Sequence, residues 1–599
     1  MAIQTNSSRG LQQQSPPLDA QTLGKRPSAD RYTITETKGK RHRTNPVGNT
    51  LVNCRYCDAL MWQAESQRKT RDITKLSFSI CCHAGRVSLP KMKETPPYLD
   101  KLLKDANFLQ HIRTFNSLFA FTSMGAKVDE SINRRPGPYC YRVHGKNYHR
   151  LGSLLPIDGE SPKFLQLYIF DTTNEVQNRI KALTNGKSLT PPDESIICGL
   201  LEMLDDTNEL AKIYRMARDQ HEEADPTEMS IRLVGQRQRG RQYDLPTADE
   251  IAGLIIGDLS LTIGKRDVIV QYKSNNLQRV SELHPKFMSL QYPLLFPYGE
   301  DGYHEQIPLL PGEKAIKREF VTMLEFYSYQ IQTRLSQGTT LIRSGRLLQQ
   351  YVVDAYIAIK QERLGWHARN QKTLRAELYH NICDAIDKGD SDANNLGKRI
   401  ILPSSFTGGP RYMAQNNHDA MGICRLFGNP DLFITITANP NWVEIKDHLE
   451  ISGNSTASDR PDIECRVFKM KLEELVADIW DGVFFGKAKS VIYTIEFQKR
   501  GLPHADILVW QDDSKKITKG KSILDNRYVV PHNLPLLKKY QAHVNVEWCC
   551  KTEAIKYLFK YVTKGVDRAT IVVETASCAA VKIKADANYV DEIKNYQEC

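Results

Sequence analysis

The sequence predicts an α/β or α+β protein with a central β-sheet in its C-terminal half. Three short apolar segments there, at 432–440, 490–497 and 504–510, are rich in β-branched residues and are typical of strands. Two amphipathic segments, LEELVADIWDGVF and TEAIKYLFKYVTKG, interleave with them and are typical of helices. Because the chain has 599 residues, we expect roughly two to four compact units.

The composition is that of a globular protein with a moderate basic excess. The formal net charge is +11, from 81 Lys and Arg against 70 Asp and Glu, which suits a polyanionic partner. The sequence has no run of about 18 apolar residues, so it does not predict a membrane span. The first residues lack the charged start and apolar core of a secretory signal, so we expect an intracellular protein.

The chain divides into four parts by composition. The first part is polar and predicted to be disordered, and its basic run at 38–43 is a candidate nuclear import signal, a phosphate-binding arm or a solvated tail. The third part is predicted to be helical over 172–228 and to form strands within 251–275. The fourth part begins with a long helical stretch predicted over about 314–388. The predicted boundaries are 1–48 for the tail, 49–160 for a cysteine-rich domain, 161–310 for a mixed helical and strand region, and 311–599 for the sheet domain, with its core at about 398–575.

Cysteines in the second part are spaced as zinc ligands. Cys54 and Cys57 form a Cys-x2-Cys pair, which presents two thiolates to one tetrahedral ion. A second pair comes from Cys81 or Cys82 together with His83, since adjacent cysteines do not easily both ligate from one regular turn. The sequence thus predicts a structural zinc site, and the alternative is that some of these residues are simply buried.

A strand in the fourth part carries a candidate site for Mg²⁺ or Mn²⁺. Residues two apart in a strand share a face, so His504 and Asp506 are expected to converge while Ala505 and Ile507 face the core. An imidazole and a carboxylate together can hold a cation that polarises a phosphate oxygen. Glu496 or Gln498 is a possible further ligand if strand alternation is unbroken. The alternative is a surface pair that binds no metal.

A helix near the C-terminus carries two candidate nucleophiles. Tyr557 and Tyr561 are one turn apart and share a face. A tyrosine hydroxyl can attack a phosphodiester and form a covalent phosphotyrosine. The alternative is that both tyrosines only pack against neighbours. Residues expected to hold the DNA backbone are Lys556, Lys560 and Lys564 on this helix, together with Lys499 and Arg500 before the His504 strand.

From about residue 50 to its end, the chain resembles the N-terminal portion of Helitron transposases, which includes the Helitron helicase-like domain. The motifs that carry the resemblance are long and rare. They are CRYC…CCHAGRVSLP, YRVHGKNYHRLGSLLP, SELHPKFMSLQYPLLFPYGEDGY, RLLQQYVVDAY, LPSSFTGGPRY, FITITANPNW, EFQKRGLPHADIL and IKYLFKYVTKG.

This resemblance implies an α+β fold of the HUH rolling-circle type, with a central antiparallel sheet flanked by helices. It implies that His504 and position 506 hold the metal and that Tyr557 and Tyr561 are the nucleophiles. One tyrosine would cut a strand and the other would accept the second cut. The implied partners are single-stranded DNA and transposon ends, without a membrane, and the implied location is the nucleus.

Two features depart from the family pattern. The family has a second histidine where this chain has Asp506, which is an acceptable Mg²⁺ ligand but changes reach and charge. Helitron transposases continue into a helicase, whereas the two GKS triplets at 186–188 and 520–522 have Lys181 and Lys515 where a phosphate loop needs glycine. We therefore expect no ATPase or helicase activity from this chain, and a helicase-bearing relative would act in trans.

Two other functions compete with strand cutting. A decayed transposase remnant would bind single-stranded DNA through basic and aromatic residues without cutting it. A structural adaptor would bridge proteins through the zinc region and show no salt-dependent affinity for DNA.

Overall fold

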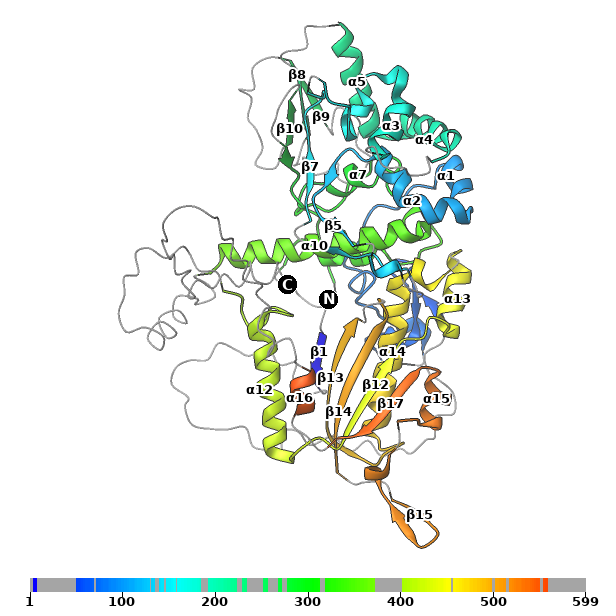
Figure 1. The fold of residues 1–599 in the computed structure, drawn as a ribbon, viewed down its shortest axis with the longest axis vertical. Helices are drawn as coiled ribbons and strands as arrows, with labels where there is room; N and C mark the ends of the chain where they lie inside the picture. The colour runs from blue at the N-terminus through cyan, green and yellow to red at the C-terminus, as the bar shows by residue number, and fades with distance from the viewer. Residues whose placement is uncertain are drawn as a thin grey trace, which may run out of the picture. The chain divides into compact units, whose positions relative to one another are not determined.

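The computed structural model shows an α+β protein with antiparallel sheets (Figure 1). Two compact units are present: unit 1 comprises 1–47, 364–442 and 465–599, and unit 2 comprises 48–363 and 443–464. No helix in the described part of the chain is long and apolar enough to cross a membrane. The structure describes residues 4–7, 50–68, 70, 72–129, 131–134, 139–144, 147–157, 159–184, 192–223, 229–233, 252–256, 268–271, 277–312, 318–371, 401–453, 456–497, 501–512, 516–529, 531–549 and 553–558.

Unit 2 is mostly helical and carries small antiparallel sheets. Its helices are α1 (Pro97–Leu102), α2 (Ala106–Phe119), α3 (Glu175–Thr184), α4 (Glu194–Thr207), α5 (Glu209–Glu223), α7 (Phe287–Gln291), α8 (Met323–Gln330), α9 (Thr340–Arg343), α13 (Val443–Ser452) and most of α10 (Gly345–Arg369). Its strands are β2 (Leu51–Asn53), β3 (Leu60–Trp62), β4 (Ser123–Met124), β5 (Lys127–Val128), β6 (Val143–His144), β7 (His149–Leu151), β8 (Met229–Leu233), β9 (Ala252–Ile256), β10 (Val268–Gln271) and β11 (Gln278–Arg279).

Helix α2 shows how sequence pattern builds the core of unit 2. The carboxylate of Asp105 accepts a hydrogen bond from the Asn107 amide and caps the helix. Apolar residues then recur at helical spacing, and Phe108, Ile112 and Phe119 are almost fully buried. The structure also contains the helices predicted within 172–228, as α3, α4 and α5. It contains the strands predicted within 251–275, as β9 and β10.

The long helical stretch predicted over about 314–388 is not continuous. The chain forms three helices there, α8, α9 and α10, separated by a non-helical segment at 331–339, while 313–317 and 372–400 lie outside the described residues. In that segment the Gly338 amide donates to the Met92 carbonyl at 3.0 Å. A Cβ on Gly338 would stand 1.7 Å from the Lys93 carbonyl oxygen. Close packing against residues 92–94 therefore overrides the local helical preference.

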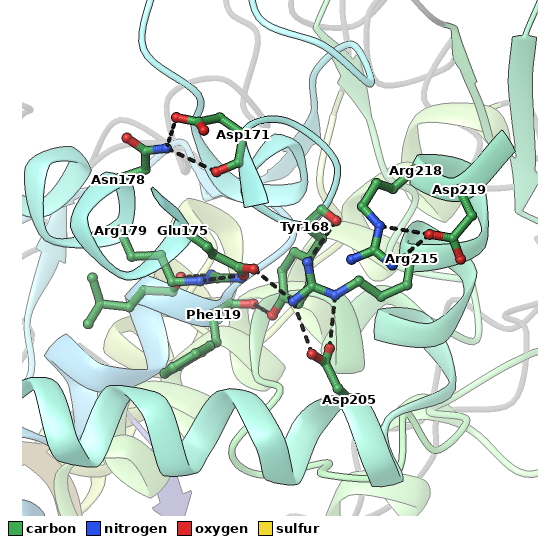
Figure 2. Close-up of polar contacts among 11 residues, drawn as sticks. Phe119, Tyr168, Asp171, Glu175, Asn178, Arg179, Asp205, Arg215, Arg218 and Asp219 are labelled. Atoms are coloured by element: carbon green, nitrogen blue, oxygen red, sulfur yellow. Dashed lines mark hydrogen bonds and ion pairs between the residues drawn. The ribbon is translucent and has the colours of Figure 1, made fainter. Parts of the chain in front are cut away.

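A buried ion-pair network ties α3, α4 and α5 together (Figure 2). Arg179 is fully buried, and its Nε donates to Glu175 Oε1 at 2.9 Å. The other carboxylate oxygen of Glu175 lies 2.8 Å from a guanidinium nitrogen of Arg215. Arg215 also pairs with Asp205 at 3.1 Å and donates to the Tyr168 carbonyl at 2.9 Å. The buried Glu175 carboxylate thus pairs with both guanidinium groups, and Asp205 supplies a second carboxylate to Arg215.

We expect Glu175→Gln to lower the free energy of unfolding of unit 2 by about 3–5 kcal/mol, because it leaves a buried guanidinium without its carboxylate. Urea denaturation followed by tryptophan fluorescence measures the change. Asp219→Asn is the matched control, since Asp219 is exposed and pairs with Arg218 at the surface, where loss costs less than about 1 kcal/mol. Equal effects of the two substitutions would contradict the prediction.

Unit 1 is built on a five-stranded antiparallel sheet in the order β1-β13-β14-β12-β17. The three predicted strands are present as β12, β13 and β14. Gln4–Ser7 forms edge strand β1, so the prediction of disorder is wrong for these four residues; 8–48 lie outside the described residues. The elements are β1 (Gln4–Ser7), β12 (Leu432–Thr437), β13 (Ala488–Phe497), β14 (Pro503–Gln511), β15 (Ile517–Lys519), β16 (Ser522–Leu524), β17 (His543–Trp548), α12 (Pro410–Phe427), most of α14 (Pro461–Trp480), α15 (Leu534–Tyr540) and α16 (Glu553–Leu558).

The two faces of this sheet differ in character. One face is largely apolar over β12, β13 and β14, and Ile434, Ile436 and Ile507 on it are fully buried. The other face carries His504 and Asp506 near the start of β14. Further along the same face, Leu508 and Trp510 pack against residues of α12 and α16. Side-chain alternation in β14 therefore produces one face with a polar end and a helix-covered end.

Candidate functional site

Four cysteines of unit 2 converge on one point. Cys54 and Cys57 lie in the turn between β2 and β3, and Cys81 and Cys82 lie in a run of turns. Their sulfur atoms all lie within 4.8 Å of one another, and Cys82 Sγ is 3.7 Å from both Cys54 Sγ and Cys81 Sγ. Sulfurs bound to one tetrahedral zinc at about 2.3 Å stand roughly 3.8 Å apart. This four-cysteine cluster (Cys54, Cys57, Cys81 and Cys82) could hold a metal such as zinc.

The prediction that His83 pairs with one of two adjacent cysteines is wrong. His83 lies outside the four-cysteine cluster, and its Nδ1 is 3.1 Å from Glu325 Oε1. The backbone is not a regular turn, because φ is +49° at His83 and +88° at Gly85. This left-handed segment folds back so that the Gly85 amide donates to Cys82 Sγ at 3.2 Å. Cys81 and Cys82 can therefore both point into the cluster.

A buried arginine stands beside the cluster. Arg334, 3% exposed, donates from its guanidinium to the Cys57 carbonyl at 2.9 Å and to Cys57 Sγ at 3.4 Å. It also donates to the Cys81 carbonyl at 3.3 Å and lies 3.6 Å from the centre of the Tyr329 ring. Hydrogen bonds from the other three thiols lower the pKa of Cys57, and the Arg334 charge lowers it further. Four thiolates around Zn²⁺ carry a net charge of about −2, which Arg334 partly offsets.

The predicted cation pair lies on unit 1. His504 Nε2 and Asp506 Oδ1 are 2.9 Å apart, and Asp506 is 3% exposed. His504 Nδ1 is 2.9 Å from Thr437 Oγ1, which faces it from β12. Alternation therefore places His504 and Asp506 together. Within the described residues, no third His, Cys, Asp or Glu completes a metal cluster here.

Two further residues surround this pair from β13. Glu496 stands directly opposite His504 in the strand register, and Thr494 stands opposite Asp506. The Thr494 hydroxyl is fully buried and makes no hydrogen bond within the part of the chain that the structure describes. Sequence reasoning missed Thr437 and Thr494. Polar residues at alternate positions of otherwise apolar strands are the signal that could have found them.

Helix α16 packs on the same face of the sheet as His504 and Asp506. Its Ile555 and Leu558 share a buried cluster with Leu508 and Trp510 of β14. The backbone of Lys556 and Tyr557 belongs to α16. The remaining predicted site residues lie outside the described residues, and they are Gln498, Lys499, Arg500, Lys560, Tyr561 and Lys564.

The comparisons with known proteins identify one domain. Residues 326–509 match the family model described as the Helitron helicase-like domain at the N-terminus. The matched segment contains Arg334, strands β12 to β14 except the end of β14, and the His504–Asp506 pair, whereas the four-cysteine cluster precedes it. No curated protein matches the sequence. The chain therefore carries a Helitron helicase-like domain over residues 326–509.

Proposed function

We propose that this protein nicks single-stranded DNA and transfers the cut strand through a phosphotyrosine, with a divalent cation held by His504 and Asp506. The observation that carries the proposal is the placement of this pair on the sheet face against which α16, the helix of Tyr557, is packed. The Helitron helicase-like domain supports a role on DNA.

The residues at this end of the sheet fit Mg²⁺ or Mn²⁺. Neighbouring ligands of an octahedral ion with bonds of about 2.1 Å stand roughly 3 Å apart, close to the 2.9 Å between His504 Nε2 and Asp506 Oδ1. The buried and unsatisfied Thr494 hydroxyl beside Asp506 is consistent with a further polar group at this point. Mg²⁺ commonly takes only one or two protein ligands and completes its shell with water and phosphate.

Each residue then has a distinct role. With a cation bound, Nδ1–H of His504 would donate to Thr437 Oγ1, which would fix the ring and leave Nε2 available to hold the ion. Asp506 supplies the oxygen ligand. A bound cation polarises a phosphate oxygen of the scissile bond. Five basic residues hold the neighbouring phosphates, and they are Lys556, Lys560, Lys564, Lys499 and Arg500.

The chemical step is attack by a tyrosine oxygen, from Tyr557 or Tyr561, on the scissile phosphorus. A bond forms between phosphorus and the tyrosine oxygen, and one phosphorus–oxygen bond to a deoxyribose breaks. The tyrosine loses its proton, and the released deoxyribose oxygen gains one and becomes a free hydroxyl end. A strand-transfer cycle on transposon ends would act in the nucleus, with unwinding supplied by a helicase-bearing relative.

A second candidate function is single-stranded DNA binding by a catalytically decayed domain. Asp506 stands where the Helitron pattern has histidine, and its carboxylate is buried against His504 rather than projecting from the sheet. Such a pair can persist as a hydrogen bond without any ion.

Covalent trapping tests the proposal. Zinc-loaded protein is mixed with end-labelled single-stranded DNA and Mn²⁺ and run on a denaturing gel. We expect a DNA-shifted protein band that is lost in Tyr557→Phe/Tyr561→Phe and retained in Tyr528→Phe, a control at an exposed tyrosine of unit 1. Salt-sensitive binding without a band in wild type, and with a band in Asp506→His, would favour the decayed domain.

A further inference from the structure

The hairpin of β15 and β16 projects from unit 1 beyond the end of β14 (Figure 1). Ile517 pairs with Leu524, Thr518 with Ile523 and Lys519 with Ser522. A two-residue loop, Gly520–Lys521, closes the ribbon, and φ at Gly520 is +64°, as expected for glycine at the first position of a tight hairpin turn. The triplet GKS at 520–522 is therefore a hairpin tip, not a phosphate loop, which would connect a strand to a helix.

Both faces of this ribbon are open to solvent. Residues 516–523 are all exposed, and Ile517 and Ile523 are 60% and 68% exposed. The two isoleucines point to opposite faces, because Ile517 is opposite Leu524 whereas Ile523 is opposite Thr518. A two-stranded ribbon that packs against nothing is marginally stable. Threonine also favours strands, so it could replace the exposed isoleucines without loss of strand preference. The exposed isoleucines thus have no role in the core of unit 1.

The ribbon also carries a net positive charge. Lys516, Lys519 and Lys521 are exposed, and residues 516–524 contain no Asp or Glu. Lys519 and Lys521 have no ion pair within the described structure. Asp525, which directly follows the ribbon, is paired with Arg527 at 2.7 Å. Exposed apolar side chains framed by free lysines are complementary to a polyanion that also offers apolar surfaces.

We propose that the β15–β16 ribbon binds duplex DNA, with its lysines on phosphates and an isoleucine against the bases. A two-stranded ribbon fits the major groove, where apolar side chains can contact the methyl group of thymine. The inference rests on the proposed function only in taking DNA as the substrate, and it adds a duplex contact to the single-stranded one.

Position along β14 sets the distance to the cut site. His504 lies near the start of β14 and the ribbon follows its end at Gln511. The seven residues from His504 to Gln511, at about 3.4 Å each, place the end of β14 roughly 24 Å from His504. With about 3.4 Å per base pair, the ribbon would reach duplex DNA roughly seven base pairs or more from the nick.

Binding of two labelled DNAs tests this proposal: a single strand, and the same strand ending in a stable hairpin of about 15 base pairs. We expect Lys519→Ala/Lys521→Ala to weaken binding of the duplex-bearing DNA about tenfold near 0.1 M salt and to lower its salt slope by about 2. Ile517→Ser/Ile523→Ser should weaken it about threefold or more with an unchanged slope. The single strand should bind all variants within about twofold.

The matched control is Lys487→Ala/Lys538→Ala, two exposed lysines of unit 1 off the ribbon. Unaltered thermal unfolding shows that every variant is folded. The proposal is overturned if wild type gains no affinity from the duplex, if the ribbon variants keep that gain, or if they lose single-strand binding equally. A wild type that binds duplex through the ribbon but traps no covalent DNA would contradict the proposed nicking and leave the ribbon contact standing.

Discussion

Cys57→Ser is expected to release zinc and to lower the free energy of unfolding of unit 2 by more than about 4 kcal/mol, the range in which loss of a structural metal falls. The pKa values of both Cys54 and Cys57 are lowered, and Cys57 is the one whose sulfur and carbonyl both accept from Arg334. A serine hydroxyl is not deprotonated at neutral pH and is a poor zinc ligand. Zinc per chain, measured by mass spectrometry of the metal, should fall from one to near zero.

The chain offers controls of two kinds for this experiment. Cys198→Ser removes an exposed cysteine of the same unit and should keep both zinc and stability. His83→Ala should also keep zinc, because His83 faces Glu325 rather than the cluster. Retention of zinc by Cys57→Ser together with its loss in His83→Ala would contradict the assignment of the four cysteines as ligands.

The sequence predicts only the part of this cluster that neighbouring residues determine. The spacing of Cys54 and Cys57 is a local property of a tight turn, and it predicts two ligands directly. Ligation by both Cys81 and Cys82 depends on left-handed backbone at His83, which residue spacing does not reveal. Arg334 lies 277 residues from Cys57, so only tertiary packing brings them together.

The sheet site was more predictable, because strand alternation is a property of consecutive residues. The face shared by His504 and Asp506 follows from their spacing alone. The partners from other strands, Thr437 and Thr494, depend on register, which is set by pairing across the sheet. The β15–β16 ribbon cannot be predicted from residue pattern, because each of its strands has only three residues.

Asp506→Ala is expected to weaken Mn²⁺ binding at the sheet site by more than about 100-fold. Substitution of a residue that only orients a ligand costs about 10–100-fold in metal affinity, and loss of a ligand itself should cost more. Thr437→Val should fall within that range of about 10–100-fold, because it removes the hydrogen-bond partner of His504 Nδ1 and leaves both ligands in place. Titration of zinc-loaded protein with Mn²⁺, followed by electron paramagnetic resonance, measures affinity without depending on DNA cleavage.

Thr518→Val is the control, since Thr518 is an exposed threonine of unit 1 that lies on β15, outside the five-stranded sheet. It should bind Mn²⁺ as wild type does. The graded order of Thr518→Val, Thr437→Val and Asp506→Ala distinguishes an ion site from a hydrogen-bonded pair. If His504 and Asp506 share only a proton, all three variants and wild type should show the same weak, nonspecific Mn²⁺ binding, and the cation would have to be held elsewhere.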